Sequence, residues 1–212
     1  NDINLTNQEQ IFAGTNEGFD EIWWFYPSAD SDTNDRYVVY NYMQKIWYYG
    51  TIARTAWLDS GIRDFPVAAT NTKNLVLHES GLDDAETATT SAISASITSA
   101  QFDLDDGHKF MLISRMLPDI SFEGSTADSP VVTMSMSALQ NSGSGFNDPL
   151  SESGNSSGTV TRTASSPVEK FTDQIFLRVR GRQVSFKVES SSTGIAWQLG
   201  SPRIDMRPDG RR

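Results

Sequence analysis

The chain has 212 residues and a formal net charge of −10 at pH 7. At roughly 100 to 200 residues per domain, this length allows one large or two small domains. The sequence contains no Cys, which excludes disulfides, thiolate catalysis and Cys-based metal sites. Its longest apolar runs, such as Ile22 to Tyr26, are far shorter than the ~18 residues of a membrane-spanning helix, so we expect no membrane-spanning segment. The first residue is Asn1 rather than Met, and we expect a fragment or a processed product.

Charge is distributed unevenly along the sequence. Residues 162–212 contain ten Lys or Arg and five Asp or Glu, a net charge of +5, whereas residues 1–161 carry a net charge of −15. The overall acidity opposes a general nucleic-acid binder, because neutralising phosphates requires clustered Lys and Arg. The asymmetry suits association between neighbouring copies, or a basic tail that meets an anion. The alternative is that the arginines line solvated strand faces.

The first half is rich in aromatic residues with strand-like spacing. We predict strands at 21–26, 36–42 and 45–50, and a turn-rich connection at 27–35. This antiparallel unit resembles most of a four-stranded β-propeller blade. One blade cannot bury both of its faces, so we expect the end of a larger propeller, with the other blades in a missing N-terminal part or in other chains. The alternative is a small extension packed on a neighbour.

The second half differs, because its strands are carried by aliphatic residues, Met and Phe, and small polar residues at 83–90 separate the two halves. We therefore predict an all-β chain. Its parts are a propeller-blade-like aromatic unit at 1–85, a linker at 86–91 and an antiparallel β-sandwich at 92–212.

Alternation with period two underlies the predicted sandwich, because it is typical of strands with one buried and one solvated face. Residues 174–189 predict a β-hairpin that turns at 180–183, where Gly181 supplies a positive φ. The Ser-, Gly- and Asn-rich tract at 140–158 predicts a long exposed loop. The apolar positions of two further alternating runs are Ile93, Ala95 and Ile97, and Val132, Met134, Met136 and Ala138.

Two acidic segments are candidates for cation binding. Residues 30–35 match the Asp-x-Asp-x-Asn opening of a calcium loop, but Asp35 stands where that loop needs Gly, and Asn41 where it needs Glu. We favour a capped turn there. Residues 103–107 read Asp-Leu-Asp-Asp-Gly, and Asp-Gly between two strand patterns favours a turn over a cation site.

Other catalytic patterns are weak. His78 and His108 lie far apart in the sequence, so a zinc site requires the fold to bring both together with a carboxylate; we expect His108 to be exposed. Residues 154–158 match the letters Gly-x-Ser-x-Gly, but no strand precedes them and no helix follows. We therefore assign no catalytic, cofactor-binding or metal-binding residue, and we expect a protein that is not an enzyme and needs no cofactor.

A glycan-binding or glycan-hydrolysing β protein is one functional alternative. Exposed Trp and Tyr stack on sugar rings, and paired carboxylates hydrolyse glycosidic bonds when held ~5 to 9.5 Å apart. A plain carbohydrate-binding β-sandwich without catalysis is a third possibility. A groove lined by Trp47, Trp57 and at least two converging carboxylates favours either glycan interpretation. Burial of both Trp side chains between strands disfavours both.

Ten segments spread over most of the chain carry a resemblance to one family. They are Phe19–Ser28, Asp35–Tyr42, Trp47–Gly50, Arg54–Asp59, Leu75–Gly81, Phe102–Gly107, Arg115–Asp119, Arg178–Gln183, Trp197–Gly200 and Pro202–Arg212. With these segments the chain resembles the tail nozzle or packaged-DNA stabilisation proteins of short-tailed bacteriophages, and its aromatic half is similar to their last propeller blade.

This resemblance implies a structural protein of the virion tail. Such proteins form a homo-oligomeric ring, usually of six copies, that contacts adaptor and fibre or spike proteins. The ring forms and closes the conduit through which genomic DNA leaves, without sequence-specific binding. We expect an acidic lumen, which repels DNA over a Debye length of ~8 to 10 Å. We also expect Arg180→Glu or Arg182→Glu to weaken assembly more than folding.

Overall fold

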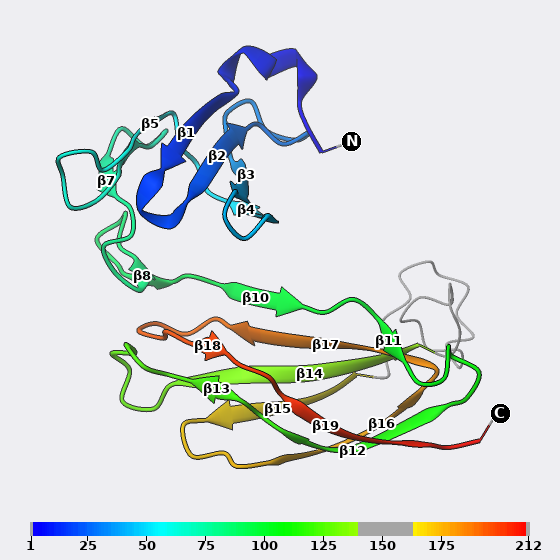
Figure 1. Ribbon diagram of the computed structural model, residues 1–212. Coiled ribbons are helices and arrows are strands. Elements are labelled where there is room, and N and C mark those ends of the chain that lie inside the picture. Colours follow the sequence, from blue (N-terminus) through cyan, green and yellow to red (C-terminus); the bar gives the residue numbers. More distant parts are fainter. Residues whose placement is uncertain (1, 140–162, 211–212) are drawn as a thin grey trace. The chain divides into compact units, whose positions relative to one another are not determined.

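The computed structural model describes residues 2–139 and 163–210 (Figure 1). The fold is all-β, as predicted: strands dominate, helix is almost absent, and all strand pairs are antiparallel among the described residues. The chain divides into two compact units, residues 1–81 and 82–212. The boundary falls before the segment that we expected to be a linker, where β8 (Asp83–Asp84) pairs with β9 (Ser91–Ala92) around the predicted linker residues.

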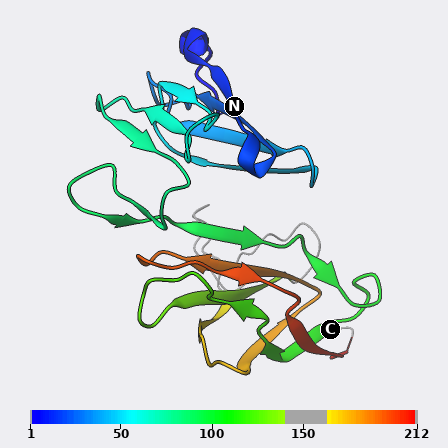
Figure 2. The same ribbon diagram turned by 60° about the vertical axis from the view of Figure 1, so that its left-hand side comes forward.

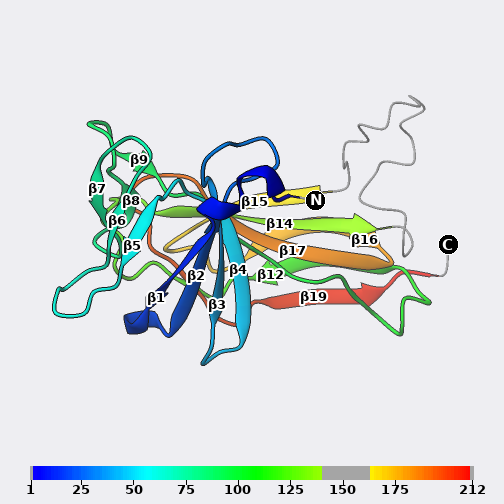
Figure 3. The same cartoon turned by 90° about the horizontal axis from the view of Figure 1, so that it is seen from above.

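Unit 1 contains a four-stranded sheet in the order β1-β2-β3-β4, whose strands lie side by side in Figure 3. The three predicted strands are confirmed, with bounds within one residue. The strand before them was not predicted, because its sequence Phe-Ala-Gly-Thr-Asn has only one large apolar residue. The elements are η1 (Leu5–Gln10), β1 (Phe12–Asn16), η2 (Glu17–Phe19), β2 (Glu21–Tyr26), β3 (Arg36–Asn41) and β4 (Ile46–Thr51).

A smaller sheet follows in the same unit, formed by β5 (Ala56–Leu58), β6 (Val67–Ala69) and β7 (Leu75–Leu77). Its Trp57 packs against the first sheet, with ring centroids 5.4 Å from Trp23 and 5.7 Å from Phe25. Trp57 Nε1 also donates a hydrogen bond of 2.7 Å to the carbonyl oxygen of Thr15. A Cβ at Gly14 would lie 2.3 Å from Cδ1 of Trp57, so only glycine leaves room for this ring.

Among the described residues, unit 2 contains two larger sheets and two short ones, one of which is the β8-β9 pair. One has the order β10-β17-β14-β15, with β11 also paired to β17; another has the order β16-β12-β19; and β13 pairs with β18. The strands are β10 (Ala95–Thr98), β11 (Phe102–Asp103), β12 (Met111–Leu117), β13 (Ile120–Ser121), β14 (Val131–Leu139), β15 (Thr163–Glu169), β16 (Ile175–Gly181), β17 (Gln183–Ser190), β18 (Gln198–Leu199) and β19 (Arg203–Pro208).

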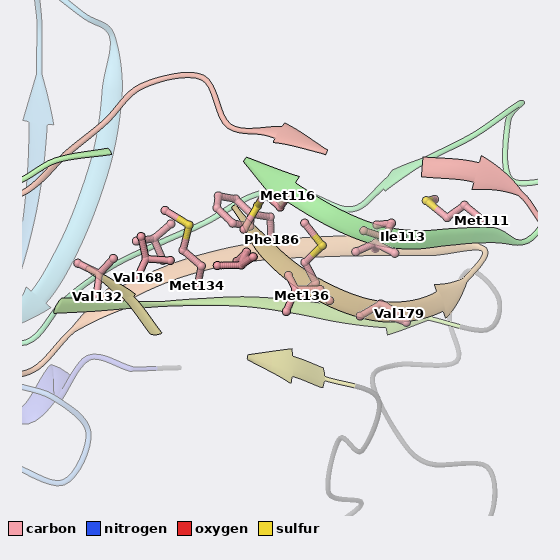
Figure 4. Packing of buried hydrophobic residues seen from close by; sticks show 14 of the residues in the cluster. Met111, Ile113, Met116, Val132, Met134, Met136, Val168, Val179 and Phe186 are labelled. Atoms are coloured by element: carbon pink, nitrogen blue, oxygen red, sulfur yellow. The ribbon is translucent and has the colours of Figure 1, made fainter. Parts of the chain in front are cut away.

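The core of unit 2 draws its side chains from both larger sheets (Figure 4). The alternation predicted for β14 is confirmed, because Val132, Met134, Met136 and Ala138 are all buried. Their partners across the core include Met111, Ile113 and Met116 of β12 and Ile175, Leu177 and Val179 of β16. At about 25 cal/mol per Å² of buried apolar surface, this cluster is the main stabilising element of the unit.

The predicted hairpin at 174–189 is wrong, although both of its strands exist. β16 pairs with β12, whereas β17 pairs with β14 in the other sheet, so the chain passes from one sheet to the other at residues 181–183. Gly181 is not among the residues with positive φ. Glycine is required by close approach instead, because a Cβ there would lie 2.8 Å from the carbonyl oxygen of Leu139.

The buried face predicted for residues 93–97 is also wrong. Ile93 and Ile97 are 53% and 51% exposed. Ile97 lies opposite the buried Val188, on the core-facing side, but β10 is an edge strand with β17 as its neighbour (Figure 2). The alternation with period two therefore predicted the strand and the side of the sheet on which Ile97 lies. It did not predict that this side chain stays half exposed at the sheet edge. The tract at 140–158 lies outside the described residues.

In the parts of the chain that the structure describes, no helix combines the length and apolar character needed to cross a bilayer.

Candidate functional site

The four-stranded sheet of unit 1 carries aromatic side chains on both faces. Residues opposite each other in an antiparallel pair share a face, and the strand register separates the two sets. One face holds Phe12, Trp23, Phe25 and Tyr37 beneath Trp57. We call the other the open aromatic face; it consists of Ile22, Trp24, Tyr26, Val38, Tyr40, Trp47 and Tyr49.

The open aromatic face is ordered by ring stacking. The ring of Trp47 lies 4.5 Å from that of Tyr40 and 5.8 Å from that of Trp24, centroid to centroid, and both pairs are stacked. Trp47 is nevertheless 62% exposed and Tyr49 is 80% exposed. Large aromatic side chains gathered on one sheet face and left in water mark a surface for interaction.

The opposite face ends in a polar cluster around Glu21, which is buried. One carboxylate oxygen of Glu21 accepts a 2.9 Å hydrogen bond from Nε1 of Trp23, and the other accepts one from the hydroxyl of Tyr48. Nδ2 of the buried Asn16 lies 3.5 Å from Glu21 Oε2 and 3.4 Å from Glu79 Oε1. A single amide therefore bridges two carboxylates, which the sequence did not predict because Glu79 lies 58 positions after Glu21.

The two carboxylates influence the titration of this cluster. Desolvation of its carboxylate raises the pKa of Glu79, the charge of Glu21 raises it further, and the hydrogen bond from Asn16 opposes both. Burial also raises the pKa of Tyr48, with a further contribution from its hydrogen bond to Glu21. The side chains of Glu21, Tyr48 and Glu79 therefore lie close together on the Trp23 face of the sheet, opposite the open aromatic face.

His78 belongs to the same side of unit 1. Its Nε2 accepts a 2.8 Å hydrogen bond from Nε of Arg54, which is buried, and its ring lies edge-on to that of Trp57 at 4.6 Å. His108 is exposed, as predicted, and lies in unit 2. Among the described residues, no group of three or more His, Asp or Glu side chains is arranged to hold a metal ion.

The acidic segment at 30–35 forms a turn capped by its own side chains. The carboxylate of Asp35 accepts hydrogen bonds of 2.7 Å from both the backbone nitrogen and the hydroxyl of Ser28. Asp32 accepts one from the side chain of Asn7. This matches the capped turn that we favoured over a calcium loop.

Residues 103–107 also form a turn, with positive φ at Asp105, Asp106 and Gly107. The backbone nitrogen of His108 donates to the carbonyl oxygen of Asp105 at 3.1 Å. The Gly-x-Ser-x-Gly match at 154–158 lies outside the described residues.

Trp47 and Trp57 do not line a common groove. Trp57 packs on Trp23 and Phe25, whereas Trp47 stacks on Tyr40 on the opposite face of the same sheet. The groove that we expected for either glycan interpretation, with both tryptophans and two carboxylates, is therefore absent from unit 1 as described.

Arg180 and Arg182 are engaged within their own unit. Arg182 donates to the carbonyl oxygens of Gly107 and His108 at 2.9 and 3.1 Å. Arg180 forms an ion pair of 2.5 Å with Asp209. Both guanidinium groups lie over the ring of Phe110, at 4.2 and 4.8 Å. The contacts show that both arginines also hold parts of unit 2 together. That Arg180→Glu or Arg182→Glu weakens assembly more than folding stays a prediction.

A scan against protein-family models found no match to this chain, and a search of curated proteins found none either.

Proposed function

We propose that this protein is a structural subunit of a phage tail nozzle ring, located in the virion tail, which forms and closes the DNA exit conduit. The observation that carries the proposal is the open aromatic face of unit 1. A scaffold of this kind works through surfaces that match those of neighbouring copies, and Trp47 and Tyr49 lie in water on the single chain.

The proposal includes the finer architecture of both units. The sheet β1-β2-β3-β4 is a sequential antiparallel four-stranded unit, which is the composition of one propeller blade. Blades pack face to face, and the aromatic side chains on both faces of this sheet suit that packing. Unit 2 is proposed to be a β-sandwich, since its core side chains come from two antiparallel sheets.

The resemblance to tail nozzle proteins suggests that the assembly is a ring. Stacking between the aromatic side chains of the open aromatic face and those of a neighbouring copy would stabilise that ring. Aromatic pairs contribute about 0.5–1.5 kcal/mol beyond the burial of their area. Tyr49 and Trp47 sit on β4, which is an edge strand of its sheet. Several such contacts repeated around a ring stabilise the closed assembly without any chemical turnover.

Glycan binding at a phage tail is the second candidate function. The stacked rings of Trp24, Trp47 and Tyr40 form a surface on which a sugar ring can lie. A hydrolytic role has less support, because the paired carboxylates of Glu21 and Glu79 are bridged by Asn16 on the other side of the sheet. Titration of tryptophan fluorescence with neutral oligosaccharides tests this candidate.

Negative-stain electron microscopy of the full chain tests the nozzle proposal. We expect closed rings for the natural sequence and loss of rings for Tyr49→Lys, because the lysine places a charge where an aromatic contact forms. Phe171→Lys is the matched control, since Phe171 is an aromatic residue of unit 2 that is 87% exposed. Rings that persist in Tyr49→Lys, or an absence of rings in the natural sequence, would contradict the proposal.

A further inference from the structure

The outward face of the sheet β16-β12-β19 in unit 2 is basic. The register places Leu112 between Arg180 and Arg207, and Arg115 between Phe176 and Asp205. Opposite residues share a face, so these side chains point away from the core formed by Ile113 and Val179. We call this surface the arginine face; its arginines are Arg115, Arg178, Arg180, Arg203 and Arg207.

The two carboxylates on this face, those of Asp205 and Asp209, are both in ion pairs with arginines of the same face. Asp205 pairs with Arg115 at 2.6 Å, and Asp209 pairs with Arg180 at 2.5 Å. Arg178, Arg203 and Arg207 have no carboxylate partner among the residues that the structure describes, and each is exposed. The face therefore presents three uncompensated positive charges on a chain whose net charge is −10.

Two of these free arginines converge on one cavity. Arg178 and Arg207 line a cavity of about 560 Å³ together with Leu112, Val179, the paired Arg180 and Asp209, and Thr163 and Ala164 of β15. Phe176, which is 74% exposed, lies outside this lining, two residues from Arg178 on the same side of β16. Arginine is enriched among the residues that contribute most to protein–protein binding.

We propose that the arginine face is the surface through which one copy of this chain binds an acidic surface of a second copy. The inference rests on the proposed ring and names one of its contacts. Residues 1–161 carry a net charge of −15, so each copy supplies both the basic face and its complement. A contact between two different surfaces of identical subunits is heterologous, and such contacts generate rings when the rotation closes.

A second copy fits this face better than DNA does. Binding to duplex DNA at physiological salt relies on many phosphate contacts, and the face has three free arginines. The acidic remainder of the chain repels a polyanion, whereas it attracts the arginine face of a neighbour. Opposite charges at a protein interface also select the partner and its orientation.

The double variant R178E/R207E tests the inference by size-exclusion chromatography with light scattering. Neither side chain has a partner among the described residues, so we expect the fold to be retained, as circular dichroism would verify. We expect the assembly of R178E/R207E to require at least tenfold higher protein concentration than that of the natural sequence. The assembly of the natural sequence should weaken as salt rises, because salt screens exposed charges.

The matched control is R63E/K73E, which changes net charge equally at two exposed residues of unit 1. Because it leaves the arginine face intact and only adds negative charge to residues 1–161, it should assemble at least as readily as the natural sequence does. Equal assembly of R178E/R207E would overturn the inference and leave the ring proposal standing. A natural sequence that stays monomeric would refute the ring proposal itself. Tight binding of a 30-base-pair duplex, lost in R178E/R207E, would instead identify DNA as the occupant and contradict our assignment.

Discussion

The two units bury their sheets in different ways. Among the described residues, the buried hydrophobic cluster of unit 2 has fifteen members, whereas that of unit 1 has three: Trp23, Phe25 and Val39. Unit 2 packs aliphatic and Met side chains between two sheets. Unit 1 places aromatic rings on both faces of one sheet and leaves one face in water. Antiparallel strands alone therefore do not decide whether a unit buries its side chains in a core or presents them on a surface.

Removing core volume should have the largest effect. Met136 is fully buried on β14, and Met136→Ala should lower the free energy of unfolding of unit 2 by about 2–5 kcal/mol through lost burial and a cavity. Met206→Ala is the control, because Met206 is 38% exposed at the edge strand β19. Hydrogen exchange measured by mass spectrometry should show the loss of protection in unit 2 peptides. An equal loss in both variants would mean that burial does not set the stability of this unit.

Glycine substitution probes the smaller core of unit 1. Gly14→Ala introduces a Cβ 2.3 Å from the Trp57 ring, and overpacking of this kind costs about 1–3 kcal/mol. In Gly18→Ala the new Cβ meets no described atom within 4 Å, so the change should stay within about 0.5 kcal/mol. Tryptophan fluorescence during denaturant unfolding reports on unit 1, which holds four of the five Trp residues. Matching unfolding curves for the two variants would contradict the role of Trp57.

The arginines of unit 2 divide into structural and free ones. Arg182→Ala removes two hydrogen bonds to backbone carbonyls and a contact with the Phe110 ring. It should cost about 1–2 kcal/mol in the free energy of unfolding. Arg178→Ala should cost less than about 0.5 kcal/mol, as for surface residues in general. Thermal unfolding followed by circular dichroism compares the two variants. If Arg178→Ala destabilised the protein as much as Arg182→Ala does, the division into structural and free arginines would be contradicted.

Replacing the titratable Glu79 by Gln should change the free energy of unfolding of unit 1 least among these variants. Its pKa is raised in the folded protein by desolvation and by Glu21, so the folded state binds this proton more tightly than the unfolded state does. Stability conferred by the protonated form is then lost as pH rises from the ordinary carboxyl value through the folded pKa. Glu79→Gln should therefore stabilise unit 1 at pH 7 and make its stability less dependent on pH. A destabilised Glu79→Gln at pH 7, in urea unfolding, would contradict this sign.

The local strand patterns were predictable from the sequence, whereas the pairing of distant strands was not. β2 followed from its run of aromatic residues. The buried positions of β14 followed from period two, because a strand alternates its side chains whatever its neighbours are. β16 and β17 were predicted as a hairpin on the basis of Gly181, but their partners, β12 and β14, come from elsewhere in the chain. Sequence proximity favours a hairpin, and only packing reveals that the chain changes sheet there.

For the candidate surfaces too, the sequence indicated which residues were involved but not which distant residues contact them. The aromatic strands of the first half predicted a blade that cannot bury both of its faces, but which face is covered became clear only from the position of Trp57 on β5. The roles of Arg180 and Arg182 were missed because Asp209 and Phe110 approach them through long-range contacts. Residues that act through partners far along the chain leave little local pattern.

The most direct test of the account is the mass of the intact full chain by native mass spectrometry in volatile salt. The account predicts a single closed multiple of 23.4 kDa, six copies by resemblance to tail nozzles, across a range of protein concentrations. A species of 23.4 kDa alone at every concentration would contradict the claim that the open aromatic face and the arginine face join copies into a ring.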